Sequence, residues 1–261
     1  MISRQASECL NLEYRLRFGI FIVHLKRLTL KPYPTKTSIK LLFLLPFLFV
    51  SCEDDEDCCT VVLPKREQAA YTVTFSFNWN EKDFPTDYRA GPHFSPLVGW
   101  THQKDNPFFD AGKTATDGIE RMAEVGATST LVAELDAQIK EGKGYKIYTG
   151  NGLSGGVGNI AIEVEVTTDF PAVSLATMLA PSPDWYVACV AVNLLGADNS
   201  FVKEKTVVGH VYDAGTDSGT TFTSANSDTN PKAAIAKITQ PPLGDGNGVK
   251  ASLCSITFTK K

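Results

Sequence analysis

The chain has 261 residues, of which 43% are hydrophobic and 21% are charged. This composition is typical of a globular protein, and it excludes a fully disordered chain, a collagen-like repeat and a membrane protein with many spans. Residues 1–51 hold eight Lys/Arg and two Asp/Glu, which gives this segment a net charge of +6. Because the whole chain has a net charge of -4, residues 52–261 carry a net charge of -10. Because basic side chains supply most non-specific affinity for phosphates, this charge argues against nucleic acid as a partner.

The N-terminal part has the pattern of an export signal. Ten uncharged apolar residues, 41–50, follow a lysine-containing flank and precede Ser51 and Cys52. Ten apolar residues are too few to span a bilayer, which needs about 20, but they suit a secretory signal peptide. The ending resembles a bacterial lipobox, which predicts lipidation of Cys52 and attachment to the outer membrane or cell surface through that lipid. An ordinary signal peptide, with Cys52 a chance residue, is the alternative.

Residues 1–30 do not fit a signal peptide, because they carry a separate apolar patch with its own basic flanks. A start codon placed too far upstream explains them most simply, and an uncleaved membrane-inserted arm is the alternative. We therefore assign residues 1–51 to a wrong start plus a signal peptide. Residues 52–70 are assigned to an acidic linker, because Glu53–Asp57 are five like charges in a row that repel one another and stay solvated. No role is assigned to Cys58 and Cys59.

Residues 71–261 are expected to form an all-β domain. In Tyr71–Trp79, aromatic side chains and a valine alternate with Thr, Ser and Asn, the period of a half-buried strand. The same alternation recurs at residues 160–166. Further apolar runs separated by Gly, Asn, Asp and Pro lie at residues 172–179, 185–194, 202–208 and 249–258. Strands this frequent predict an antiparallel β-sandwich.

Two short helices are predicted between the first two of these strands. Asp117 and Glu120 have the spacing of a capping box, and Gly126 provides a stop. A second apolar stripe at helical spacing is formed by Leu131, Leu135 and Ile139. Packing of both helices against the sandwich is the expected outcome.

Several catalytic patterns are weak. Gly150–Gly155 matches G-x-G-x-x-G, but a strand follows it where a dinucleotide site requires a helix, so a hairpin loop is expected. Asp217–Thr220 resembles the aspartic protease motif, whose chemistry needs two carboxylates that share a proton. This motif, or a metal-activated water, is the basis of a hydrolase as the alternative function. The three histidines beyond residue 52 lack the spacing of zinc ligands, and these are His93, His102 and His210.

Two cysteines lie in strand-like runs, Cys189 and Cys254. In an oxidising compartment they would either form a disulfide or remain buried thiols, and the sequence leaves both open.

Carboxylates gather in two predicted loops. Asp213 and Asp217 lie four residues apart on a loop that contains glycine, and Asp184 lies between a proline-stiffened turn and a strong strand. Their oxygens are hard ligands that suit Ca²⁺. The same residues also suit simple turns, in which an Asp side chain accepts a main-chain amide. Sequence chemistry alone leaves these two interpretations open.

Four segments together resemble the spondin domain family, over about residues 71–239. They are Gly91–Gly99, Ala123–Gly126, Pro181–Trp185 and Asp213–Gly219. The resemblance implies a C2-like β-sandwich, a Ca²⁺ site formed by Asp184, Asp213 and Asp217, and no catalysis. It also implies an adhesion or ligand-binding role, with an extracellular protein or glycan as partner.

Overall fold

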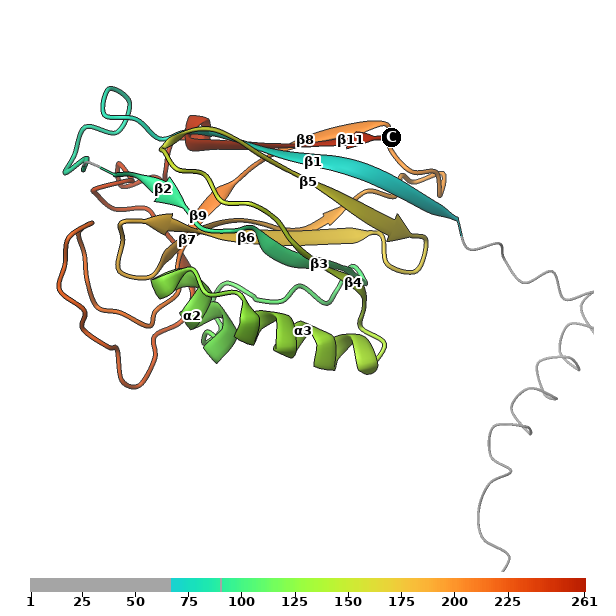
Figure 1. Cartoon of the computed structure of the whole chain (residues 1–261), viewed down its shortest axis with the longest axis horizontal. Helices are drawn as coiled ribbons and strands as arrows, with labels where there is room; N and C mark the ends of the chain where they lie inside the picture. Colours follow the sequence, from blue (N-terminus) through green and yellow to red (C-terminus); the bar gives the residue numbers. More distant parts are fainter. Residues whose placement is uncertain (1–66, 90) are drawn as a thin grey trace, which may run out of the picture. The chain divides into compact units, whose positions relative to one another are not determined.

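The computed structural model describes residues 67–89 and 91–261. The predicted signal peptide, the lipidation at Cys52 and most of the acidic linker lie outside these residues. The described residues form two antiparallel β-sheets and two α-helices (Figure 1). Within these two ranges no helix is both long and apolar enough to cross a bilayer. The predicted all-β sandwich with two inserted helices is confirmed.

The first sheet contains the strands with the clearest sequence alternation. Its order is β5 (Val157–Thr167), β1 (Gln68–Asn78), β11 (Cys254–Lys260) and β8 (Glu204–Val208). Side chains of β1 alternate between fully buried and partly exposed, as predicted. Several strand boundaries differ from the prediction. Strand β1 begins three residues before the predicted domain start, and a short 3-10 helix, Ala251–Leu253, replaces the beginning of the predicted last strand.

The second sheet is mostly buried on both faces. Its order is β10 (Ala236–Lys237), β9 (His210–Asp213), β7 (Trp185–Asn193), β6 (Ala172–Ala180), β3 (Val98–His102) and β4 (Gly144–Thr149), and β2 (His93–Phe94) pairs with β6. Five of these strands were not predicted, namely β2, β3, β4, β9 and β10. Three of the five have only two or four residues, and β3 is buried at every position, so these four strands lack a visible polar alternation.

Helices α2 (Asp117–Val125) and α3 (Ser129–Lys140) cover the outer face of the second sheet (Figure 1). The predicted capping box is wrong by one residue. The N-cap is Thr116, whose hydroxyl accepts the Ile119 amide at 3.3 Å. Asp117 lies in the first turn and pairs with Lys232 at 3.0 Å instead. Gly126 ends α2 with φ 67°, as a left-handed C-cap requires.

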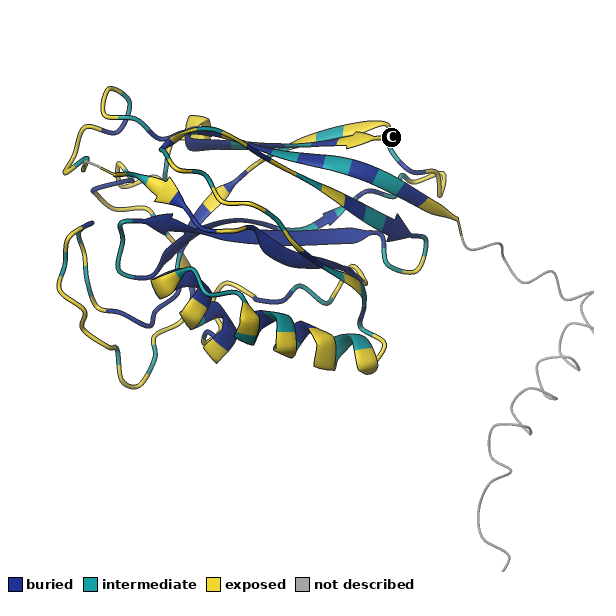
Figure 2. Cartoon of the chain, in the orientation of Figure 1, coloured by how far each residue is buried: buried dark blue, intermediate teal, exposed yellow. Residues whose placement is uncertain are grey.

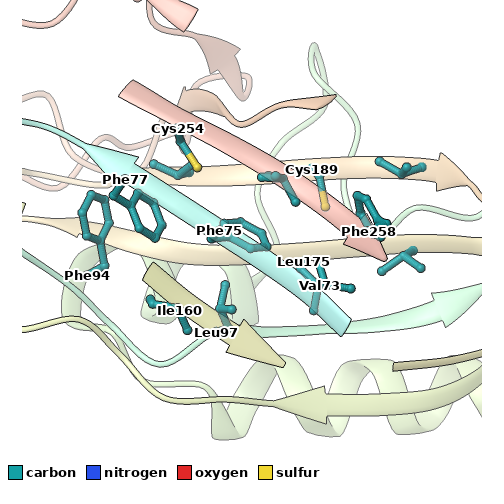
Figure 3. Packing of buried hydrophobic residues seen from close by; sticks show 14 of the residues in the cluster. Val73, Phe75, Phe77, Phe94, Leu97, Ile160, Leu175, Cys189, Cys254 and Phe258 are labelled. Carbon is teal, nitrogen blue, oxygen red and sulfur yellow. The ribbon is translucent and has the colours of Figure 1, made fainter. Parts of the chain in front are cut away.

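The sandwich therefore has two cores, one between the sheets and one between the second sheet and the helices. Strand β6 lies between them and is buried along its whole length (Figure 2). In the first core, side chains of β1 and β11 face those of β6 and β7 (Figure 3). Cys189 and Cys254 are both buried there as free thiols, so the structure has the second of the two states that the sequence left open.

Between β8 and β9 the chain passes from the first sheet to the second through a connection of one residue, Gly209. The Gly209 amide donates to the Cys254 carbonyl at 2.9 Å. A Cβ at this position would lie 2.6 Å from the Cys254 Sγ, which explains the glycine. The crossing places β9 beside β7, and this pairing builds the candidate site.

Candidate functional site

Two distant segments meet where β7 begins and β9 ends. Trp185, the first residue of β7, pairs with Asp213, the last residue of β9. Asp184 immediately precedes β7, and Ser182 stabilises its turn by accepting the Trp185 amide at 3.2 Å. The register of the second sheet thus brings the two predicted acidic loops together. We call Asp184, Asp213 and Asp217 the acidic turn.

Asp184 is the most buried member of the acidic turn, with 0% of its surface exposed. Its Oδ2 accepts the amide of Thr216 at 2.7 Å, the amide of Asp217 at 3.1 Å and the Thr216 hydroxyl at 3.3 Å. Its Oδ1 is buried and has no hydrogen-bond partner. Burial, reinforced by the Asp213 charge, raises the pKa of Asp184 to about 6, although the amides of Thr216 and Asp217 act in the opposite direction.

Asp213 and Asp217 make the turns of the alternative interpretation. Asp213 Oδ1 accepts the Gly215 amide at 2.8 Å. Asp217 Oδ1 accepts the Gly219 amide at 2.6 Å, and its Oδ2 accepts the Ser227 amide at 3.0 Å. Burial raises the pKa of Asp213, and the hydrogen bond from Gly215 partly offsets this effect. Main-chain amides therefore already engage both oxygens of Asp217.

Glu124, near the end of α2, belongs to the same acidic surroundings. Burial raises the pKa of this carboxyl, a hydrogen bond with Thr216 lowers it, and the charges of Glu120, Asp217 and Asp228 raise it further. No sequence pattern assigns a role to Glu124, although it lies in one of the four segments that resemble spondin domains. The helix and the acidic turn are 59 residues or more apart in sequence, so only packing brings them together.

The fit of a cation to the acidic turn is partial. The unpartnered Oδ1 of Asp184 and the carboxylate chemistry around it suit a hard cation. Over the described ranges, however, no group of three or more His, Cys, Asp or Glu side chains is arranged to hold a metal ion. The acidic turn as it stands is thus a hydrogen-bonded turn that leaves one buried carboxylate oxygen without a donor.

The histidines in the described ranges make their contacts away from the acidic turn. His93 bonds to the Gly91 carbonyl and His102 to the Gln103 carbonyl, and none of the histidines that the structure describes bonds to the acidic turn. A hollow of about 310 Å³ lies beside Asp213 and contains no histidine in its lining. The predicted loop at residues 150–155 is confirmed, with no helix after it, but the predicted hairpin is wrong. The loop connects β4 of the second sheet to β5 of the first, and these two strands do not pair.

Comparison with known proteins agrees with the four segments found in the sequence. A profile of the Spondin_N family matches residues 69–246. Human Spondin-2 is 30% identical over 178 residues, which are 67% of this chain and 54% of the relative. Rat Spondin-1 is 31% identical over 202 residues, or 74% of this chain and 24% of the relative. The match thus spans about half of Spondin-2 and about a quarter of Spondin-1. The chain belongs to the Spondin_N family.

Proposed function

We propose that this protein is a non-catalytic, extracytoplasmic binding module that Ca²⁺ stabilises at the acidic turn. The observation that carries the proposal is the buried Oδ1 of Asp184, which lacks a hydrogen-bond donor. A buried carboxylate that is not fully paired is costly, and a cation is the partner that removes this cost. The neighbouring carboxylate of Asp213 would help to neutralise a dication.

The expected affinity is low. Amides already engage both oxygens of Asp217 and one oxygen of Asp213, so the acidic turn must rearrange to provide more ligands. Extracellular calcium modules bind with Kd of roughly 10⁻⁴–10⁻³ M, and we place this site in that range. At a hundredfold excess over Kd, binding to the native state adds about 2.7 kcal/mol of stability. For a domain of this size that corresponds to a rise in Tm of roughly 5–10 °C.

The test compares thermal unfolding of the full chain in 10 mM CaCl₂ with its unfolding in EDTA. This calcium concentration is about 100 times a Kd of ~0.1 mM. Asp184→Asn should remove most of the calcium-dependent rise while being at least as stable as the wild type in EDTA, because it removes a buried charge. Asp184 is a better choice than Asp217, whose oxygens hold two amides. Asp198→Asn is the matched control, because Asp198 is exposed and follows the opposite end of β7. Equal calcium shifts in the wild type and Asp184→Asn would refute the site.

Attachment to a membrane through lipid on Cys52 is the second part of the proposal. The apolar run and Ser51-Cys52 support it. Mass spectrometry of the membrane fraction should find an N-terminal peptide beginning with acylated Cys52 and no peptide from residues 1–51. An unmodified peptide across the Ser51-Cys52 bond in the mature protein would contradict it.

The partner of this module is proposed to be an extracellular protein or glycan. Family membership supports binding in preference to hydrolysis. A glycan array probed with the full chain, with and without Ca²⁺, tests the glycan. Turnover of a model peptide or ester that Asp217→Asn abolishes would favour the hydrolase instead.

A further inference from the structure

A second hollow lies where the chain crosses between the two sheets, and we call it the crossing pocket. Its volume is about 260 Å³. It is lined by residues 208–211 at the β8–β9 crossing, residues 237–239 in and after β10, and residues 247–249 before the 3-10 helix. None of the three aspartates of the acidic turn lines it, although Lys237, Ile238 and Thr239 also line the hollow beside Asp213.

Two basic side chains of the crossing pocket lie on the same face of the second sheet. His210 pairs with Ala188 of β7, and Lys237 pairs with Tyr212, two residues after His210 on β9. Paired residues of antiparallel strands share a face, and so do residues two apart on one strand. His210 and Lys237 are therefore diagonal neighbours. Burial lowers the pKa of His210, and the nearby Lys237 charge lowers it further, as their proximity requires.

The crossing pocket has no carboxylate to balance these two groups. Its lining contains no Asp or Glu, and neither Lys237 nor His210 forms an ion pair with any residue in the described part of the chain. The acids nearest in sequence do not line the pocket, and each accepts a main-chain amide through one oxygen. Asp213 accepts the Gly215 amide, and Asp245 accepts the Asn247 amide at 2.9 Å. The pocket is thus a local positive region on a protein whose residues 52–261 carry a net charge of -10.

Neutral donors complete the crossing pocket. Among its lining residues, Asn247 has a side-chain amide and Thr239 has a hydroxyl, and both can donate hydrogen bonds. Val208 adds exposed apolar surface, whereas Ile238 lies on the opposite face of the sheet from Lys237 and packs, like Val249, against the first core. A charged donor and two neutral donors around a small volume are what an acid group requires.

We propose that the crossing pocket binds an oxyanion group, namely a carboxylate, sulfate or phosphate, carried by a small ligand. The Lys237 ammonium provides the charge-assisted hydrogen bond, and His210 lies beside it. This binding does not depend on Ca²⁺ or on the acidic turn.

The experiment is a proton NMR titration of the full chain without added calcium, at constant ionic strength set with NaCl. Sodium acetate, sulfate and phosphate are added in separate arms, which distinguishes the three anions. The ring resonances of His210 should shift and saturate in at least one arm. Those of His102 should stay in place, because that ring is 0% exposed and serves as an internal reference.

Two variants make the test specific. Lys237→Gln should weaken binding at least tenfold, as followed by the same His210 resonances. Lys104→Gln, which changes an exposed lysine outside the pocket lining, should leave the affinity unchanged. The proposal is overturned if no arm gives a saturable shift, or if Lys237→Gln binds the anion as tightly as the wild type.

Discussion

His102 should make this protein lose stability in mild acid, by an amount that its surroundings define. The ring is fully buried in β3 and stacks on Trp100, with ring centres 5.2 Å apart. Its Nδ1 lies 2.6 Å from the Gln103 carbonyl and its Nε2 lies 2.8 Å from the Ser174 hydroxyl. A neutral ring protonated on Nδ1 donates to the carbonyl and accepts from the hydroxyl, so both contacts are satisfied without a charge.

The magnitude follows from the change in pKa. Burial lowers the pKa of His102 from 6.5 to about 4, although the bond to Gln103 acts in the opposite direction. The unfolded chain therefore binds more protons than the folded chain between these values. The stability contribution is complete above about pH 6.5 and is lost as pH falls to about 4. At 1.36 kcal/mol per pKa unit, the loss is about 3 kcal/mol.

The assay is urea unfolding of the wild type and of His102→Gln at pH 7 and pH 4. Gln keeps an acceptor for Ser174 and does not titrate. The variant should be less stable than the wild type at pH 7, by about 1–2 kcal/mol for the altered hydrogen bonds. At pH 4 this deficit should disappear or reverse, because only the wild type has had to protonate a buried ring.

Comparing the two proteins removes the contributions of other groups. Asp184 acts in the opposite direction, because its pKa is raised to about 6 and its ionised form is the costly one in the folded state. Its effect is the same in both proteins and cancels in the difference. The reasoning is refuted if the stabilities of the wild type and His102→Gln fall in parallel from pH 7 to pH 4.

Two further predictions concern the sandwich itself. The Tyr148 hydroxyl accepts the Glu165 amide at 2.8 Å and donates to its carbonyl at 3.2 Å, which joins β4 of one sheet to β5 of the other. Tyr148→Phe should cost about 1–2 kcal/mol in urea unfolding, whereas Lys146→Ala, which removes an exposed ion pair to Glu165, should cost less than about 1 kcal/mol. Burial raises the pKa of Cys189 to about 12, so iodoacetamide should alkylate Cys189 and Cys254 only after denaturation. Alkylation of the native protein, or a disulfide in mass spectra, would contradict the buried free thiols.

Residue patterns were sufficient to predict elements that have one solvent-exposed face and one buried face. Strand β1 alternates because its inner side chains pack in the first core while its outer side chains face water. Helix α2 was predicted because its apolar spacing and Gly126 are local signals. Its cap was misplaced by one residue, because Thr116 and Asp117 are both good caps and tertiary contacts with Lys232 engage the second.

Tertiary structure alone decided what the functional groups do. Sequence chemistry identified Asp184, Asp213 and Asp217 as oxygen donors, since that depends on residue type. Which oxygens accept amides, and that one Oδ of Asp184 is left without a donor, depends on the pairing of β7 with β9. The approach of Lys237 to His210 likewise follows from the register of β10 on β9. Register joins residues far apart in the chain through packing and hydrogen bonds that no local pattern encodes, and for that reason only the folded molecule specifies these contacts.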